Sequence, residues 1–475
     1  MGGRYVAAAW VGVPAACGPV GGVARHGKVV CPEPAVNVSV IIPVYNGEAE
    51  LAQCLGALAK SLVAPFEILV VDDCSTDGSR DVAARLGARV LSTGVNSGPA
   101  KARNLGAREA RGEVLFFLDA DVVAHSDAVG RVRQAFAADA AVDAVIGSYD
   151  DNPAEADFLS QYKNLMHCFV HQTGHEQAST FWSGCGAIRR EVFLAHSGFD
   201  ESYARPAIED IELGYRLYQA NRKMVLDKGL RVKHLKRWTF WNLLKTDILD
   251  RGIPWTELIL RDRNMPNDLN LQLSQRISVA LAFLCVGFAL LMTLYWRGYF
   301  LTPVFALLLF MMGRFWLDGS AATLSRTVFL GVSGAFGVLV LLAWQSHMLG
   351  IIPPVVLGYV LLFLRHRYSF DDSRKSQVVS WLMGLYAALS VLFILAYLPS
   401  HLVIGVFFLI VMALVVLNNQ FYLFLAAKRG RAFAFAAIPF HLLYHFYNGI
   451  SFGAGLLRYS WGTLTGRGRA AVPGK

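Results

Sequence analysis

The sequence predicts a chain of two parts, an α/β domain followed by a helical domain that crosses a membrane. Of the 475 residues, 55% are hydrophobic and only 17% are charged, whereas soluble domains contain about 25% charged residues. From residue 36 to about 235, apolar runs typical of buried strands alternate with stretches of helical periodicity. After residue 275, uncharged runs approach or exceed ~18 residues, the length that spans a bilayer.

The charges are distributed unevenly between these parts. Residues 276–475 hold 15 Lys and Arg against three acidic residues, whereas residues 1–275 hold 29 against 32. A nucleic-acid-binding protein would need a basic face on a folded domain, but here the excess lies beside apolar runs, where it orients a chain in a membrane. We therefore predict a lipid bilayer as a partner and no nucleic acid.

Residues 1–35 are rich in Gly, Ala and Pro, and we expect a poorly ordered N-terminal extension. The α/β domain is predicted over residues 36–235. Continuous apolar strands separated by helices are typical of a parallel sheet covered on both faces. The predicted strands are Val38–Val44, Glu67–Val71, Arg89–Leu91, Val114–Leu118 and Val142–Ile146, and the clearest helices are Glu48–Ser61 and Pro99–Arg111.

Residues 236–275 mix aromatic and charged residues, which predicts an amphipathic segment at the membrane interface, or alternatively a plain surface helix. Residues 276–475 form the predicted multi-pass transmembrane domain. Its basic loops, Arg365–Lys375 and Lys428–Arg431, are expected in the cytoplasm. This requires about six crossings, with Ala432–Leu457 as a re-entrant or interfacial segment. The crossings are Ile277–Trp296, Tyr299–Gly313, Val328–Gln345, Leu349–Leu364, Val378–Leu398 and Leu402–Ala427.

Acidic residues follow two of the predicted strands. Asp119 and Asp121 end the fourth strand, where alternate residues point to one side. Paired carboxylates together with substrate phosphates suit Mg²⁺ or Mn²⁺, although capping of a turn is the alternative. Asp72 and Asp73 end the second strand, and one of them is expected to accept hydrogen bonds from a nucleobase or ribose. The alternative there is a cap from the turn that follows.

Two further loops hold candidate binding residues. Pro43 and Tyr45 end the first strand, and the Tyr45 ring could pack on a base. Pro99 begins a helix whose N-terminus could help to hold phosphate. Gly184 lies among small residues that would leave room for an acceptor, with an ordinary turn as the alternative.

The order of these motifs resembles the family 2 glycosyltransferases, which have the GT-A nucleotide-sugar-binding fold. The resemblance covers about residues 36–238, in VSVIIPVYNGEAEL, EILVVDDCSTDGS, NSGPAKARNLGAREARGEVLFFLDAD, SGCGAIRREVF, GFDE and EDIELGYRL. It implies inverting transfer of a sugar from a nucleotide-diphosphate donor.

The resemblance also implies a role for each acidic residue. Asp119 and Asp121 would hold a metal on the diphosphate, and Asp72 and Asp73 would lie near the base. The Glu209–Asp210 pair would supply the general base, which we assign to Asp210 because a sugar hydroxyl must lose its proton as it attacks. Glu209 would lie at the nucleotide sugar. A helix cap is the alternative role of Asp210.

His234, Arg237 and Trp238 stand in a segment, HLKRW, that resembles the Q-x-x-R-W motif of cellulose, chitin and hyaluronan synthases. The resemblance implies that Arg237 and Trp238 position the diphosphate and the acceptor. This chain has His234 where Gln is usual, which weakens any inference of processive synthesis. His234 is either a third metal ligand or a surface histidine.

The prediction for function is a membrane-bound glycosyltransferase of cell-envelope glycan synthesis. Its acceptor would be lipid-linked or a polysaccharide, and its catalytic domain would face the cytoplasm at the plasma (inner) membrane, where nucleotide sugars are available. Transfer to a polyprenyl phosphate is the second enzymatic possibility. An inactive glycan transport or scaffold protein is the alternative of another class, disfavoured because Asp119, Asp121 and Asp210 are all present.

Overall fold

The structure is a computed structural model that describes residues 36–266, 268–292, 352–367 and 374–465, with a few isolated positions between 306 and 338. The N-terminal extension 1–35 lies outside the described residues. The predicted crossings 299–313 and 328–345 lie almost wholly outside them, and so does the end of the first crossing.

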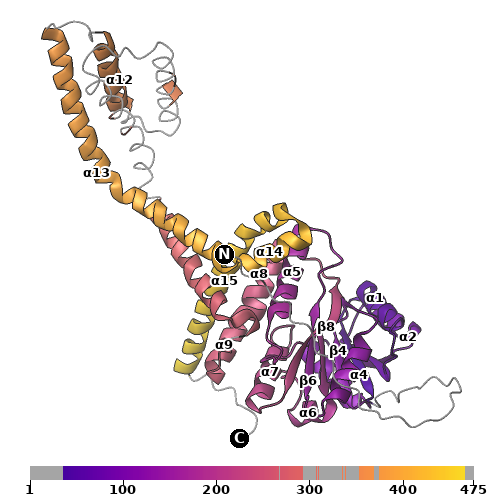
Figure 1. The fold of residues 1–475 in the computed structure, drawn as a ribbon. Coiled ribbons are helices and arrows are strands. Elements are labelled where there is room, and N and C mark those ends of the chain that lie inside the picture. The colour runs from indigo at the N-terminus through magenta and orange to yellow at the C-terminus, as the bar shows by residue number, and fades with distance from the viewer. Residues whose placement is uncertain are drawn as a thin grey trace, which may run out of the picture.

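The N-terminal domain is built on one eight-stranded mixed sheet with the order β3-β2-β1-β4-β7-β6-β8-β5 (Figure 1). The strands are β1 Val38–Val44, β2 Glu67–Asp72, β3 Arg89–Ser92, β4 Val114–Leu118, β5 Val122–Ala124, β6 Ala144–Tyr149, β7 Cys185–Arg189 and β8 Met224–His234. All five predicted strands are present, within one to three residues at their ends.

The sequence analysis predicted a parallel sheet, and this prediction is wrong in part because the sheet is mixed. Strands β1 to β4 pair in parallel, but β7 runs antiparallel to both β4 and β6. The reason lies in the connection before β7. The Asp119 amide just beyond β4 donates to the Gly184 carbonyl just before β7, so β7 starts at the edge where β4 ends and must run back.

Helices cover both faces of the sheet. They are α1 Glu48–Leu58, α2 Ser79–Arg85, α3 Pro99–Glu109, α4 Ala128–Ala138, α5 Phe158–Thr173, α6 Arg190–Ala195 and α7 Glu209–Gln219. Alternate residues of β4 point to opposite faces. Phe116 packs in the cluster that includes α1 and α4, and Phe117 packs in the cluster that includes α3, α6 and α7.

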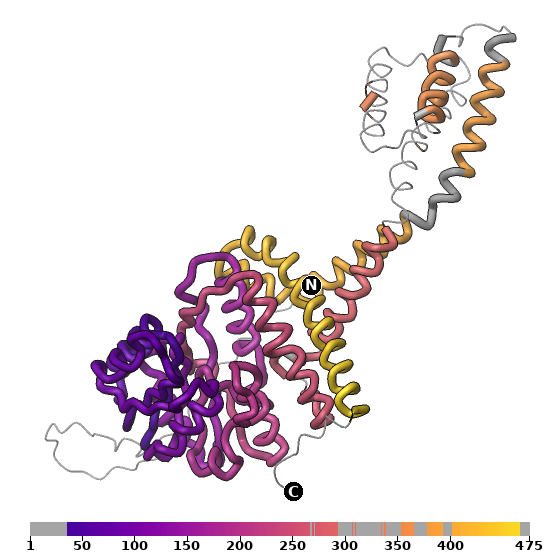
Figure 2. Tube along the Cα trace, turned by 180° about the vertical axis from the view of Figure 1, so that it is seen from behind, coloured from indigo at the N-terminus to yellow at the C-terminus, as the bar shows by residue number. Residues whose placement is uncertain are grey.

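Helices make up the rest of the described chain. They are α8 Phe240–Lys245, the π-helical turn η1 Thr246–Gly252, α9 Ile253–Asp262, the 3₁₀ turn η2 Leu269–Leu271, the helix Leu273–Met292, α12 Ile352–Arg367, α13 Arg374–Leu417, α14 Asn419–Arg429 and α15 Arg431–Leu464. Helix α15 lies along α9 and η1, as seen from behind in Figure 2.

One helix among the described residues, Leu273–Met292, is long and apolar enough to cross a membrane. His401–Leu417 and Asn419–Arg429 would make a second candidate if taken together, but they are bent by 64° at Asn418. Helix α13 passes without a break through the two runs predicted as separate crossings, 378–398 and the start of 402–427. The evidence for membrane association is therefore weak, and six crossings remain a prediction.

Candidate active site

The predicted acidic residues gather where the parallel strands of the sheet end. Asp72 is the last residue of β2, Asp119 follows β4, and Asp121 precedes β5. Glu209 and Asp210 come from the first turn of α7. In open α/β sheets, ligands bind outside the carboxyl ends of the strands, so this edge is the candidate site.

Arg103 of α3 joins two of these groups. Its guanidinium is buried and donates to Asp119 Oδ1 at 2.6 Å and to Glu209 Oε1 at 3.0 Å. Burial would lower the pKa of Arg103, but the charges of Asp119, Glu209 and Asp210 outweigh it and raise that pKa. The sequence analysis missed this residue. The signal available was a basic residue in the first turns of a helix that follows a strand end.

Asp210 lies beside this network in a partly buried position. Its Oδ2 accepts hydrogen bonds from the Ser183 amide (3.0 Å) and the Ser183 hydroxyl (3.2 Å). Burial, followed by the charge of Glu209, raises the pKa of the Asp210 carboxyl to about 6. The N-cap position of α7 is Ile208, so Asp210 is not the cap. A carboxyl with such a pKa is suited to accept a proton near neutral pH.

Asp121 and His234 face each other at the end of β8. His234 pairs in register with Val122, and its Nε2 lies 3.7 Å from Asp121 Oδ2, longer than a hydrogen bond. The His234 ring also stacks on Tyr149 at 4.4 Å between centroids, which holds its plane. Burial would raise the pKa of the Asp121 carboxyl, but His234 and Lys236 outweigh burial and lower that pKa. His234 is 6% exposed, so it is not a surface histidine.

This pair provides two donors for a cation. One carboxylate and one imidazole suit Mn²⁺ better than Mg²⁺, which prefers oxygen ligands alone. Asp119 has Oδ1 engaged by Arg103, which leaves Oδ2 for a metal. Within the described residues, no group of three or more His, Cys, Asp or Glu side chains is placed to hold an ion. Two of the predicted ligands therefore fit, and a diphosphate would have to complete the site.

Asp73 fastens a loop. Its Oδ1 accepts from the Thr93 hydroxyl (2.8 Å) and the Ser97 amide (2.9 Å), and its Oδ2 accepts from the Gly98 amide (2.7 Å). Gly98 has φ +88° and lies against the Ala204 backbone, so this turn favours glycine. Asp73 thereby orients the start of α3, the helix that carries Arg103.

Asp72 and Tyr45 lie in the neighbouring loops. Asp72 is fully buried, accepts from the Ser75 amide at 3.1 Å and lies 3.3 Å from the Arg80 guanidinium. Tyr45 is 53% exposed and follows Pro43 at the end of β1. An exposed ring beside this edge is available to a planar ligand.

The remaining predicted residues are divided between surface and core. Arg237 is exposed. Trp238 is only 4% exposed and packs with Leu243 and Tyr447, so its ring contacts protein. Gly184 is buried, and a Cβ there would lie 2.8 Å from Trp182 Nε1. Their roles at a diphosphate or acceptor stay predictions.

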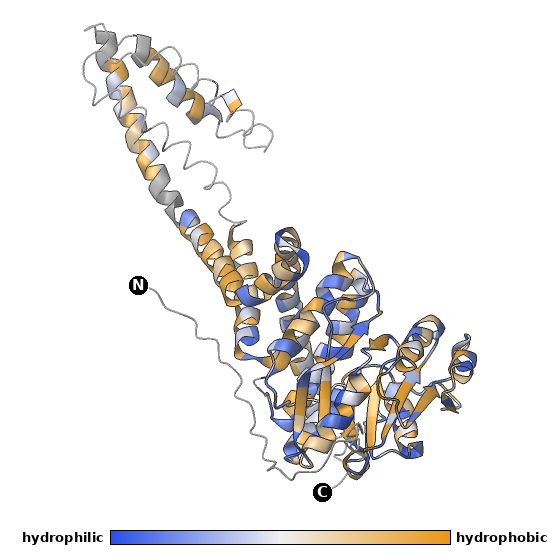
Figure 3. Ribbon diagram, turned by 45° about the vertical axis from the view of Figure 1, so that its right-hand side comes forward, coloured by the Kyte–Doolittle hydropathy of each residue, from blue (hydrophilic) through white to orange (hydrophobic). Residues whose placement is uncertain are grey.

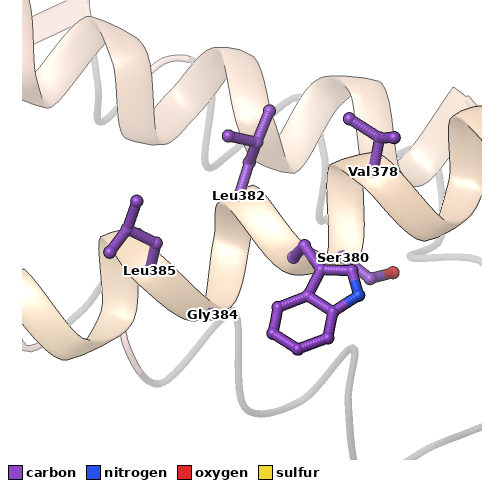
Figure 4. A pocket seen from close by; sticks show the side chains of 6 residues that line it. Val378, Ser380, Leu382, Gly384 and Leu385 are labelled. Carbon is purple, nitrogen blue, oxygen red and sulfur yellow. The ribbon is translucent and has the colours of Figure 1, made fainter.

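A cavity of about 120 Å³ opens beside Asp210. Residues from α5, η1, α9 and α15 line it, including Lys163, His171, Arg251 and Asn448. A second hollow, shown in Figure 4, runs along α13 between Val378 and Leu385 and is lined by apolar and small residues without an acidic group. Only the first hollow adjoins the chemistry described above.

Residues 39–196 match the family model described as glycosyl transferase family 2. This stretch is a family 2 glycosyltransferase domain. Its mixed α/β sheet is GT-A-like and is followed by the C-terminal helical region.

Similar proteins include validoxylamine A glucosyltransferase of Streptomyces hygroscopicus subsp. limoneus, 31% identical over 234 residues, which are 42% of this chain and 52% of that protein. Poly(ribitol-phosphate) beta-N-acetylglucosaminyltransferase of Staphylococcus aureus is 40% identical over 93 residues, 18% of this chain and 16% of that protein. The chain thus spans about half the length of the first relative and much less of the second.

Solved structures with a similar fold include a mannosyltransferase from Pyrobaculum calidifontis in complex with GDP-Man and Mn²⁺. Its TM-score is 0.35 and its identity 17%, over 78% of this chain and 88% of that one. A second is residues 1–349 of the S. aureus enzyme TarS in complex with UDP-GlcNAc. Its TM-score is 0.37 and its identity 20%, over 48% of this chain and 65% of that one.

Proposed function

We propose that this protein transfers a sugar, with inversion, from a nucleotide-diphosphate sugar to an acceptor hydroxyl. The observation that carries the proposal is the placement of Asp210. This partly buried carboxyl, with a pKa of about 6, lies next to a cavity on one side. On the other side, Glu209 and Arg103 connect it to Asp119.

The chemistry follows from these groups. Asp210 takes the proton of the acceptor hydroxyl while its oxygen attacks the anomeric carbon, and the bond from that carbon to the diphosphate oxygen breaks. Asp121 and His234 would hold Mn²⁺ or Mg²⁺, with the diphosphate completing the site. Such an ion, when bound, neutralises charge on the leaving diphosphate. Arg103 holds the Asp119 and Glu209 carboxylates in place through its hydrogen bonds.

The nucleotide is proposed to lie between Tyr45 and Asp72. Tyr45 is exposed for stacking on the base. Oδ2 of Asp72 is buried without a hydrogen-bond partner, although Arg80 lies nearby. Such an atom could accept a hydrogen bond from a base or ribose hydroxyl.

The acceptor is proposed to be lipid-linked or a polysaccharide at the cytoplasmic face of the plasma membrane. The basic loop that ends α14 supports this orientation. Lys428 Nζ lies 2.5 Å from Asp151 Oδ2, and Arg429 donates to Gln161 Oε1 at 2.6 Å. Because the catalytic domain contacts this loop directly, a cytoplasmic loop requires a cytoplasmic active site. A reporter fused to the C-terminus that is active only outside the cytoplasm should stay silent.

Purified full-length protein, assayed with a panel of nucleotide sugars and cell-envelope glycolipids, should release nucleoside diphosphate, and only with Mn²⁺ or Mg²⁺ present. Asp121→Asn and His234→Ala should raise the metal concentration needed for half-maximal activity. Release that is insensitive to metal chelation would refute the metal site. No binding of any nucleotide sugar would favour the scaffold alternative. Mass spectrometry of glycolipids that accumulate in a deletion strain would identify the acceptor, including a polyprenyl phosphate.

A further inference from the structure

Arg251 stands out in the cavity beside Asp210. It belongs to the π-helical turn η1, lines the cavity and is partly buried. Within the described part of the chain, its guanidinium has no hydrogen bond and no acidic oxygen within 4 Å. π-Helical turns often occur at functional sites, and this one places an unpaired cation at the wall of a cavity.

The other charged groups of the cavity are already paired or neutral. Lys163 Nζ contacts both carboxylate oxygens of Asp247 at 2.8 and 2.6 Å, and Tyr447 donates to Asp247 Oδ2 at 2.6 Å. Burial lowers the pKa of His171 to about 4 and lowers that of His167 well below its usual value, so both imidazoles are neutral near pH 7. Arg251 is therefore the unpaired cation among the described lining residues.

A second polar atom of the cavity also lacks a partner. Nδ1 of His171 is buried without a hydrogen bond in the described structure. The volume of about 120 Å³ exceeds the ~10–15 Å³ that one water molecule needs on the same measure. That space is large enough for a phosphate group.

The position of the cavity separates it from the proposed donor site. Asp210 lines it, whereas Asp119 and Asp121 do not. Its walls come instead from α5, η1, α9 and α15, at the junction with the C-terminal helices. Gly252 sets this junction, because a Cβ there would lie 2.5 Å from Ser451 Cβ of α15. The close approach of η1 to α15 holds Arg251 at the cavity.

We infer that Arg251 binds a phosphate group of the acceptor, next to Asp210. The inference rests on the proposed function, because only a glycosyltransferase has an acceptor. It narrows the possible acceptors to molecules that carry a phosphate, which are lipid phosphates or sugar and polyol phosphates. A guanidinium presents paired N–H donors that match two phosphate oxygens. His171 Nδ1 supplies a further polar contact.

Titration of inorganic phosphate into purified full-length protein tests this without requiring turnover. Arg251→Gln should weaken phosphate binding by roughly tenfold to a hundredfold, the effect of losing charge-assisted hydrogen bonds. The phosphate affinity of Arg251→Lys should fall between those of the wild type and Arg251→Gln, because lysine keeps the charge but not the paired geometry. Lys245→Gln, which removes an exposed charge just before η1, and Asp121→Asn on the donor side should bind phosphate like the wild type. Equal thermal unfolding midpoints would establish that the variants fold.

Phosphate binding that survives in Arg251→Gln, or no binding by the wild type, would overturn the inference. A loss shared with Asp121→Asn would overturn it too, by assigning the phosphate to the donor diphosphate. Once an acceptor is known, Arg251→Gln should raise its KM and leave the donor KM unchanged, and lipid phosphates and polyol phosphates can be compared as competitors of inorganic phosphate. Arg251-dependent phosphate binding in a protein that binds no nucleotide sugar would refute the proposed function and leave the anion site standing.

Discussion

The sheet domain and the C-terminal helices contain similar apolar residues, but the sheet domain buries them and the helices leave many of them exposed. In the sheet domain, strands such as β4 bury every side chain. In the helical region, Trp381 is 82% exposed, Leu409 69% and Phe435 77%. Figure 3 shows hydrophobic residues both in the strands of the sheet domain and along α13. Large exposed apolar surfaces often mark contact with a membrane or another protein, which supports the proposed membrane contact of the helical region.

The two regions also differ in how they use charge. At the sheet edge, Arg103 and the acidic residues remain near a ligand site. At the junction, Lys163 and Asp247 neutralise each other in the interior, with Tyr447 of α15 as a third member. The first set is placed for chemistry, whereas the second attaches the helices to the catalytic domain.

The largest effect should come from the sheet edge. Asp210→Asn should lower turnover by up to about 10⁴-fold, because the amide cannot accept the proton, while donor affinity measured by titration stays near that of the wild type. Asp81→Asn, an exposed acid on α2, is the matched control and should be fully active. Near-normal turnover in purified Asp210→Asn would remove Asp210 from the mechanism.

The next effect tests the junction. Asp247→Ala leaves Lys163 buried without its anion and should cost about 3–5 kcal/mol of unfolding free energy, measured by denaturant titration. The double variant Lys163→Met, Asp247→Leu should recover much of this loss, because no uncompensated charge remains. Glu109→Ala breaks the exposed pair with Arg89 and should cost less than about 1 kcal/mol. If Asp247→Ala and Glu109→Ala lowered the unfolding free energy equally, the Lys163–Asp247 pair would not be a buried attachment.

A pair of glycines compares the packing of the two regions directly. Gly214 of α7 faces the backbone of Thr180 and Phe181, and a Cβ would lie 2.6 Å from Thr180 Cα. Gly214→Ala should therefore destabilise the protein by roughly 1–3 kcal/mol. Gly405 of α13 has no atom within 4 Å of its Cβ position. Gly405→Ala should be neutral or stabilising by up to about 1 kcal/mol. Thermal unfolding in one detergent measures both, and a costly Gly405→Ala would reveal a partner against α13.

The smallest effect concerns pH. The pKa of Asp210 is raised to about 6, and the deprotonated form is the base. Activity should therefore be present above pH 6 and should fall about tenfold per unit as the pH drops below it. Glu209 raises this pKa by its charge, so Glu209→Gln should move the midpoint of the kcat/KM profile to lower pH. A midpoint that does not move would assign the profile to another group.

The sequence was sufficient to predict features that depend on neighbouring residues. The apolar runs of β1, β2 and β4 and the acidic residues after them are local patterns, and parallel pairing brings strand ends to one edge whatever else the fold does. The mixed sheet could not be predicted in this way. β7 is five residues long, and its direction depends on where the preceding loop returns it.

By itself, then, the sequence determined the α/β domain, the acidic residues at its edge and the apolar, basic character of the C-terminal half. Only the tertiary structure decided which partners those residues have. It placed Arg103 between Asp119 and Glu209, tied Asp73 to a loop, and paired Lys163 with Asp247, 84 residues away. The physical reason is that hydrophobic periodicity is written along the chain, whereas hydrogen bonds and ion pairs between distant segments exist only after packing has brought those segments together.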